Sequence, residues 1–162
     1  MRVVFATDHA GFALKEVLVE HVRSLGHEVE DTGAHTFVDG DDYPQYIVEC
    51  ARKISTEKRS TEEQRGIILG GSGQGEAILA NRFPHVRAVV YNGESVHAKE
   101  HGLDELRLSR EHNDANILSL GARFLPEDVA RTAVKQWLAT PFLAEERHVR
   151  RIAQIEEYSS TE

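Results

Sequence analysis

Short, β-branched apolar runs alternate along this chain with longer stretches in which apolar residues recur at helical spacing. Such alternation is typical of a parallel sheet covered by helices, because the strands of that sheet are buried on both faces. Five runs are predicted as strands, the second more weakly than the others: residues 3–6, 28–31, 67–69, 86–91 and 117–120.

Residues 12–25 are predicted as the first helix, since Leu14, Leu18 and Val22 fall on one stripe and Gly26 supplies a C-terminal stop. Further helices are predicted over 43–53, 76–81, 126–138 and 144–158, and Pro126 opens one of them at a favoured first-turn position. Together these elements predict an α/β fold, a doubly wound three-layer α/β/α sandwich with a five-stranded parallel sheet.

The chain has 162 residues, of which 40% are hydrophobic, enough to bury one continuous core. We therefore expect a single domain over residues 1–162, in which the polar stretch 55–64 is a solvated loop or helix end and not a linker. Cys50 is the one cysteine, which excludes an intrachain disulfide. The apolar runs are too short to span a bilayer or to form a signal peptide, so a cytoplasmic location is expected.

The formal net charge of −8 argues against a nucleic-acid partner, because phosphate backbones need a basic face. It does not exclude one small anionic ligand. A few arginines and backbone N–H groups can bind a single phosphate on an otherwise negative protein. The placement of the arginines therefore matters more than their number.

Polar residues and glycines follow three of the predicted strands: residues 8–11, 70–76 and 121–123. In an open parallel sheet, ligands bind beyond the carboxyl ends of the strands. The middle segment places four glycines within six residues just before a helix, so that backbone N–H groups can converge on an anion. A tight turn without a ligand is the alternative.

Two nucleotide-binding motifs fit this glycine-rich loop poorly. A dinucleotide fingerprint is disfavoured because the loop follows an internal strand, and Tyr91 and Asn92 stand where an acidic residue would end the next strand. A P-loop is excluded, since no Gly-Lys-Ser/Thr closes the loop.

Glu76 stands where the glycine-rich loop meets the next helix. A glutamate there could do no more than compensate the helix N-terminus. Its place beyond an anion-binding loop favours a general base that removes a proton from a carbon next to the stabilised oxygen. His9 follows Asp8, and this pairing makes it a better candidate than His21 or His27.

Arg147 and Arg151 lie one helical turn apart, so both guanidiniums could reach one phosphate. Taken alone, the pair fits a solvated basic face better. The candidate residues elsewhere in the chain reverse that preference. His112 and Asn113 form one more polar pair, just before the last strand.

At this point the residues resemble the type B ribose-5-phosphate isomerases, a family that includes galactose-6-phosphate and allose-6-phosphate isomerases. The resemblance covers nearly the whole chain. It rests on these segments in this order: Thr7-Asp8-His9-Ala10-Gly11, Leu14-Lys15, Asp42-Tyr43-Pro44, the run from Gly66 to Gly75, Ala80-Asn81, Arg110-Glu111-His112-Asn113, Gly121-Ala122-Arg123 and Arg147-His148-Val149-Arg150-Arg151.

The resemblance implies an aldose–ketose isomerase that opens the furanose ring and moves a proton between C1 and C2 through an enediolate. It implies no metal and no cofactor. One branch of the family has a glutamate base at the position of Glu76, and the other has a cysteine earlier in the loop, where this chain has Gly70. The resemblance therefore points to the glutamate branch.

Further roles are implied position by position. Ser72 resembles the hydroxyl that assists proton transfer, and His112 resembles the ring-opening acid/base. The other implied contacts are sugar-hydroxyl ligands at Asp8 and Tyr43, Asn113 beside His112, the backbone of Gly71, Gly73, Gln74 and Gly75 around the enediolate oxygen, and a phosphate clamp of His9, Arg123, Arg147 and Arg151. Family members build each site across a twofold dimer, so a homodimer is expected, with His112 and Arg123 coming from the partner chain.

Residues 92–109 depart from the family, because this stretch is longer than its counterpart. A surface helix-loop extension is the plain interpretation. His97 and His101 lie one turn apart, but no third ligand is nearby, so no metal site is predicted. The extension directly precedes His112 and could change which sugar is preferred.

Three hypotheses on function remain open. The leading one is isomerisation of ribose 5-phosphate. The second keeps the mechanism with another sugar phosphate, such as galactose 6-phosphate, allose 6-phosphate or a tetrose phosphate. The third is a sugar-phosphate sensor without catalysis, which the joint presence of Glu76, Ser72 and His112 disfavours.

Overall fold

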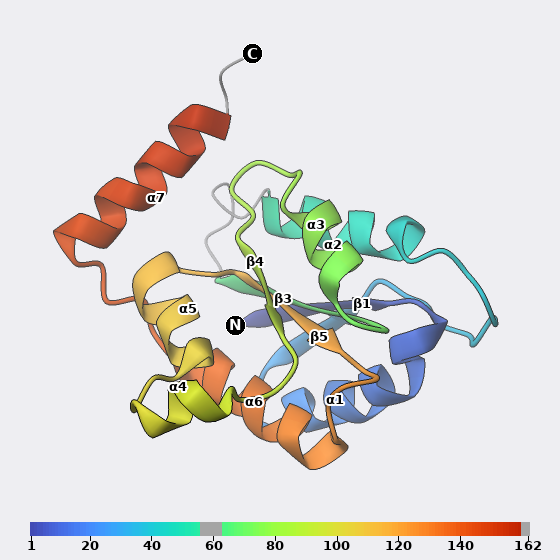
Figure 1. Cartoon of the computed structure of the whole chain (residues 1–162). Coiled ribbons are helices and arrows are strands. Elements are labelled where there is room, and N and C mark those ends of the chain that lie inside the picture. Colours follow the sequence, from blue (N-terminus) through green and yellow to red (C-terminus); the bar gives the residue numbers. More distant parts are fainter. Residues whose placement is uncertain (56–62, 160–162) are drawn as a thin grey trace.

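The computed structural model describes residues 1–55 and 63–159 and contains one five-stranded parallel sheet (Figure 1). The strand order is β2-β1-β3-β5-β4, and each pair of neighbouring strands is parallel. All five predicted strands are confirmed. Their bounds are β1 Arg2–Thr7, β2 Glu28–Asp31, β3 Gln64–Gly70, β4 Ala88–Tyr91 and β5 Ile117–Gly121.

Helices cover both faces of the sheet, as the predicted three-layer sandwich requires (Figure 1). Successive side chains of a strand point to opposite faces, so Val3 and Phe5 join one core while Val4 and Ala6 join the other. The first core contains residues of α1 (Phe12–Ser24) and α6 (Glu127–Ala139). The second contains residues of α2 (Pro44–Ser55) and α3 (Gln74–Ala80).

Several helix ends differ from the sequence prediction. Pro126 is the residue before α6 and not its first turn, whereas Pro44 does open α2. α3 begins at Gln74, two residues earlier than expected, so Glu76 lies inside its first turn. The predicted loop over 55–64 falls largely on residues 56–62, outside the described ranges.

The extension over 92–109 contains two helices that were not predicted individually, α4 (Val96–Glu100) and the start of α5 (Glu105–Asn113). Asp104 caps α5 by accepting a hydrogen bond from the backbone N–H of Arg107 at 3.0 Å. The stretch is helix and loop as expected, but Leu106 and Ser109 of it are buried. Across the described ranges, we find no helix with the length and apolar character needed to cross a membrane.

The last helix, α7 (Glu146–Ser159), projects from the body of the molecule (Figure 1). His148 is its one buried residue in the described chain, while Val149, Ile155 and Tyr158 are exposed. Its contacts with the body include the His148 ring stacked on His112, with centroids 4.2 Å apart, and Glu156 Oε2 2.6 Å from His85 Nδ1. Most apolar side chains of this amphipathic helix are therefore not buried in the core of the chain.

Candidate active site

Three chain segments meet at the carboxyl edge of the sheet. Thr7 pairs in register with Leu69, and Gly70 pairs with Gly121, so the residues that follow β1, β3 and β5 are neighbours. The Ala122 N–H donates to the Gly70 carbonyl at 2.9 Å, which joins two of these segments directly. The prediction that these three segments share one edge is confirmed.

Glu76 is the buried acid of this edge, with only 4% of its surface exposed. Its carboxylate lies against Gly70, since a Cβ added there would sit 1.8 Å from Glu76 Oε1. Burial, with a smaller contribution from the charge of Asp8, raises the pKa of Glu76. A carboxylate whose pKa is raised in this way binds a proton more readily than an exposed glutamate does, which suits a general base.

The glycine-rich loop takes its shape from a left-handed residue. Gly73 has φ +75° and caps α3, a conformation that side-chain-bearing residues rarely adopt. Ser119 Oγ of β5 donates to the Gly73 carbonyl at 2.7 Å, and Ser72 Oγ accepts weakly from the Gln74 N–H at 3.4 Å. The loop is therefore held by the strand beside it.

Asn92, at the end of β4, is a second support of this loop. Its Nδ2 donates to the Ser72 carbonyl at 3.1 Å, and its Oδ1 is buried against Gly121. Sequence analysis noted Asn92 only as a residue that is not acidic. Its position directly after a strand was the signal for a site residue.

Two predicted ligands flank the loop. The Tyr43 hydroxyl lies 2.6 Å from where a Cβ on Gly75 would be, and Arg123 Nη1 lies 3.3 Å from the corresponding point on Gly71. Arg123 thus sits against the loop of its own chain. This placement corrects the expectation that Arg123 at this loop comes from the partner chain.

Asp8 and His9 lie beside the same edge. A third residue, Asp41, which was not predicted from the sequence, lies next to His9. Asp8 Oδ1 accepts from the Ala10 N–H at 2.9 Å. Asp41 Oδ1 lies 2.8 Å from both the backbone nitrogen and the ring Nδ1 of His9. Asp41 stands two residues before Tyr43 in an acidic run, and this neighbourhood was the available signal.

Lys15, part of the resemblance but given no role, supports the segment that carries Asp41 and Tyr43. Its side chain is fully buried, and its Nζ donates to Asp31 and, at 2.8 Å, to the carbonyl of Ala34. The cation is thus paired as well as hydrogen-bonded, as a buried lysine requires. It anchors the chain where that chain leaves β2.

The remaining predicted residues lie elsewhere, at the amino edge of the sheet. His112 and Asn113 end α5 before β5 begins, and Arg147 and Arg151 lie on α7, which packs beside them through the His112–His148 stack. The five residues of β5 alone separate the two edges by about 13 Å of extended chain. One chain therefore forms two groups of predicted site residues and does not bring them together.

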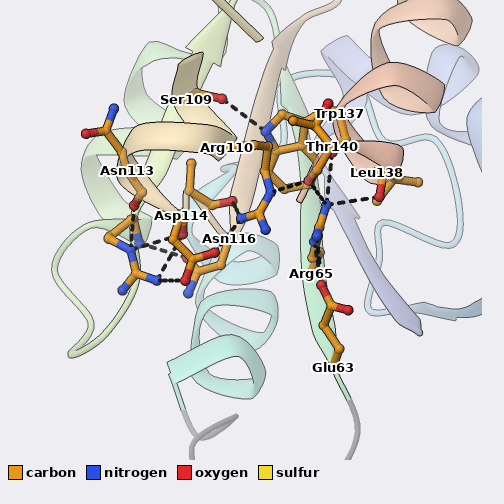
Figure 2. A network of polar contacts seen from close by, with 12 residues as sticks. Glu63, Arg65, Ser109, Arg110, Asn113, Asp114, Asn116, Trp137, Leu138 and Thr140 are labelled. Atoms are coloured by element: carbon orange, nitrogen blue, oxygen red, sulfur yellow. Dashed lines mark hydrogen bonds and ion pairs between the residues drawn. The ribbon is translucent and has the colours of Figure 1, made fainter. Parts of the chain in front are cut away.

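The amino-edge group rests on a buried network of arginines (Figure 2). Arg65 and Arg110 lie over the ring of Trp137, with guanidinium carbons 5.5 and 5.6 Å from the ring centroid. Arg110 also donates to Asp114 at 2.8 Å and to the Thr140 carbonyl at 3.2 Å. The network ties the end of α5, and with it His112, to the end of α6.

His148 itself is buried behind His112. Burial and the neighbouring His112 ring lower the pKa of His148, and Arg147 and Arg151 act in the same direction. Arg147 pairs with Glu145 at 2.9 Å while both side chains stay about half exposed. The two arginines are therefore open to a ligand or a partner and are not locked into the core.

Metal-ligating side chains gather at one place in the described part of the chain. Asp8, His9 and Asp41 have potential ligand atoms within 4.8 Å of one another. They are hydrogen-bonded or ion-paired among themselves, so we interpret the group as an ion-pair cluster. The rings of His97 and His101 stack edge to face at 4.4 Å, and no third ligand joins them among the described residues.

The fold and this edge define a class: a doubly wound α/β protein with a glycine-rich anion loop and a buried acid at the carboxyl ends of its strands. Comparison with known proteins makes the class specific. Residues 3–155 match the family described as Ribose/Galactose Isomerase. The chain belongs to this family and is a sugar isomerase.

The relatives agree with one another. Ribose-5-phosphate isomerase B of Mycobacterium tuberculosis is 36% identical over 99% of this chain and 91% of its own length. The Escherichia coli protein of that name is 34% identical, over 95% and 93%. The chain covers these relatives almost completely.

Solved structures give the same result. Ribose-5-phosphate isomerase B from Mycoplasma genitalium, solved with bound ribulose-5-phosphate, superposes with a TM-score of 0.86 at 29% identity and covers 99% of this chain and 97% of that one. The type B enzyme from Trypanosoma cruzi superposes with a TM-score of 0.85 at 34% identity, over the full length of both chains. The predicted fold class and family are confirmed.

Proposed function

We propose that this chain, as one domain, interconverts ribose 5-phosphate and ribulose 5-phosphate through an enediolate, with Glu76 as the general base. The observation that carries the proposal is the buried Glu76 carboxylate at the glycine-rich loop. The names of the relatives and the ribulose-5-phosphate bound in one of them support the choice of a pentose phosphate.

The proposed chemistry needs a base and an oxygen stabiliser side by side. Glu76 takes a proton from C2 of the aldose and returns it to C1, while backbone N–H groups from Gly71 to Gly75 stabilise the negative oxygen of the enediolate. Ser72 relays a proton between the two sugar oxygens. Asp8 and Tyr43 hold sugar hydroxyls.

The glutamate branch is supported by the space around Gly70. A side chain at this position, where the other branch has its cysteine, would occupy the place of the Glu76 carboxylate. The two bases therefore exclude each other sterically. Cys50 is not an alternative, because burial raises its pKa and its Sγ lies 3.6 Å from the Val4 carbonyl inside the second core.

The site is complete only if a second copy contributes. His112, Asn113, Arg147 and Arg151 lie at the opposite edge from Glu76, so we propose a homodimer in which the amino-edge group of one subunit meets the carboxyl edge of its partner. The exposed apolar side chains of α7 support this arrangement, because they lie on the same helix as the two arginines and a partner subunit would cover them. His112 then opens the ring, and the arginines join His9 and Arg123 at the phosphate.

The first experiment is interconversion of ribose 5-phosphate and ribulose 5-phosphate by the purified protein with a chelator present. Allose 6-phosphate and galactose 6-phosphate are assayed beside it. Pentose turnover is the expected result. Turnover of a hexose phosphate alone would keep the mechanism and assign the preference to residues 92–109, and no turnover of any sugar would overturn the proposal in favour of a sensor.

A further inference from the structure

Asp41 is a buried carboxylate that the proposed chemistry does not use. Its side chain is only 4% exposed, although it lies in a loop between β2 and α2. A buried charge is costly unless it is paired and hydrogen-bonded. Its partner is His9, whose backbone N–H donates to Asp41 Oδ1 at 2.8 Å and whose ring Nδ1 lies 2.8 Å from the same oxygen.

This double contact determines which ring nitrogen of His9 can serve a ligand. Because Nδ1 faces the carboxylate, Nδ1 carries a proton and Nε2 is left as the nitrogen for another partner. The backbone contact fixes the main chain of His9 at the same time. A carboxylate that orients a histidine in this way is a common supporting arrangement at sites where the ring has to keep one orientation.

We infer that Asp41 is a positioning residue for the substrate phosphate, holding His9 as a cation with Nε2–H directed to the phosphate oxygens. This inference rests on the proposed function, in which His9 is a phosphate ligand. It assigns a role to a residue 32 positions away along the chain from the one it orients. Asp41 acts through His9 and does not itself touch the sugar.

The charges around His9 all favour its protonated form. The hydrogen bond to Asp41 and the charge of Asp8, whose Oδ2 lies 3.9 Å from Nδ1, raise the pKa of His9 despite some burial. Burial alone would raise the pKa of Asp41, but the two contacts from His9 and a further one from Tyr46 bring it below its usual value. The ring of Phe37 lies nearly perpendicular to that of His9, with centroids 6.4 Å apart, and adds no charge.

The pH dependence follows from these directions. A raised pKa keeps His9 charged below its ordinary value of 6.5 and for some distance above it, and the charge is lost as pH rises through the folded-state value. The phosphate contact should therefore persist to higher pH than it would with an unperturbed histidine, and weaken as pH rises through the folded-state pKa of His9. Replacing Asp41 by the neutral amide should move this weakening to lower pH.

The direct test is an NMR titration of the histidine rings in the unmodified protein, with His9→Gln to assign the signal. We expect His9 to titrate above 6.5 with Nδ1 protonated in the neutral form. In Asp41→Asn the midpoint should fall, because the hydrogen bond that raises the His9 pKa is weakened. Asp39→Asn is the matched control, because it removes one exposed charge from the same loop and should leave the midpoint unchanged.

The kinetic test separates positioning from catalysis. In Asp41→Asn at pH 8, we expect KM for ribulose 5-phosphate to rise about 5- to 10-fold while kcat stays within about twofold. The alkaline limb of kcat/KM should shift to lower pH, since this ratio reports the ionisations of the free enzyme. Asp39→Asn should match the wild type in both.

Two results would overturn the inference: a wild-type His9 that titrates at or below its ordinary pKa, or an Asp41→Asn enzyme with the KM and pH profile of the control. The titration needs no activity. It therefore decides the question even if Asp41→Asn fails to fold, and it tells a failure of this inference from a failure of the proposed isomerase reaction.

Discussion

The Glu76 carboxylate occupies the space that a side chain at position 70 would need. A glutamate base at position 76 therefore favours glycine at position 70. A Cβ on residue 70 would lie 1.8 Å from Glu76 Oε1, so the buried Glu76 side chain would have to move to make room for it. Sequence analysis assigned Glu76 from its position and from the resemblance to a family. The mutual exclusion with residue 70 needed coordinates, since no local pattern shows where a carboxylate points.

Glu76→Gln should keep the shape of the site and remove its base. We expect kcat to fall about 10² to 10⁴-fold, the usual contribution of a general base, with little change in KM. Steady-state kinetics in both directions of the reaction measure this. Turnover close to that of the wild type would show that Glu76 is not the base.

Gly70→Ala should act through the same carboxylate. The added methyl group displaces the Glu76 side chain, so kcat should fall at least about 10-fold although the glutamate is still present. Combined with Glu76→Gln, it should cost little more than Glu76→Gln alone, because both changes affect one interaction. Fully additive losses in the double variant would contradict this explanation.

At the scale of elements, the prediction succeeded where signals are local. The sheet, α1, α2 and α6 follow from runs of apolar residues, and the glycine-rich loop follows from the strand before it and the helix after it. α5 was missed because its sequence is mostly polar and its buried face includes Ser109 and Arg110 beside Leu106. A helix that buries an arginine does not show the apolar stripe that predicts helices.

The same reasoning explains what was missed in the site. Asn92 and Asp41 support residues 20 and 32 positions away, so their roles appear only after the chain has folded. The resemblance implied that His112 comes from the partner chain, but it did not imply that Arg147 and Arg151 lie at the same edge of the sheet as His112. The roles proposed for His112, Asn113, Arg147 and Arg151 stay predictions.

The arginine network at the end of α5 carries a prediction of stability. Arg110→Ala removes buried hydrogen bonds to Asp114 and to two backbone carbonyls, and it also removes a cation from the face of Trp137. We expect the free energy of unfolding to fall by about 2–4 kcal/mol. Urea denaturation measures this loss.

Arg107→Ala is the control for that experiment. Arg107 lies on the same helix and pairs with Glu111 at 3.0 Å, but its side chain is 47% exposed. Exposed pairs of this spacing contribute only about 0.3–0.5 kcal/mol. Equal losses in the two variants would mean that the network is not what holds the end of α5.

At the scale of the whole molecule, the two groups of predicted site residues lie at opposite edges of the sheet, and we propose that each is one half of a shared site. A mixing experiment tests whether they belong to one functional site. Glu76→Gln and His112→Ala should each be nearly inactive as homodimers. When the two are unfolded together and refolded, the mixed dimer contains one site with Glu76 from one chain and His112 from the other, both intact.

Random pairing should therefore restore about one quarter of the wild-type activity, because half of the dimers are mixed and half of their sites are intact. Each variant refolded alone is the control. No recovery in the mixture would mean that each chain builds its site without its partner, and the proposed sharing would be wrong.

The separation of the half-sites also has a consequence for dilution. If the sugar phosphate touches both subunits, it binds the pair and not the separated chains, so it shifts association by mass action. Activity per chain should then fall as the protein is diluted, and saturating substrate should move this decline to lower protein concentration. In such an enzyme, substrate binding itself stabilises the dimer that catalyses its reaction.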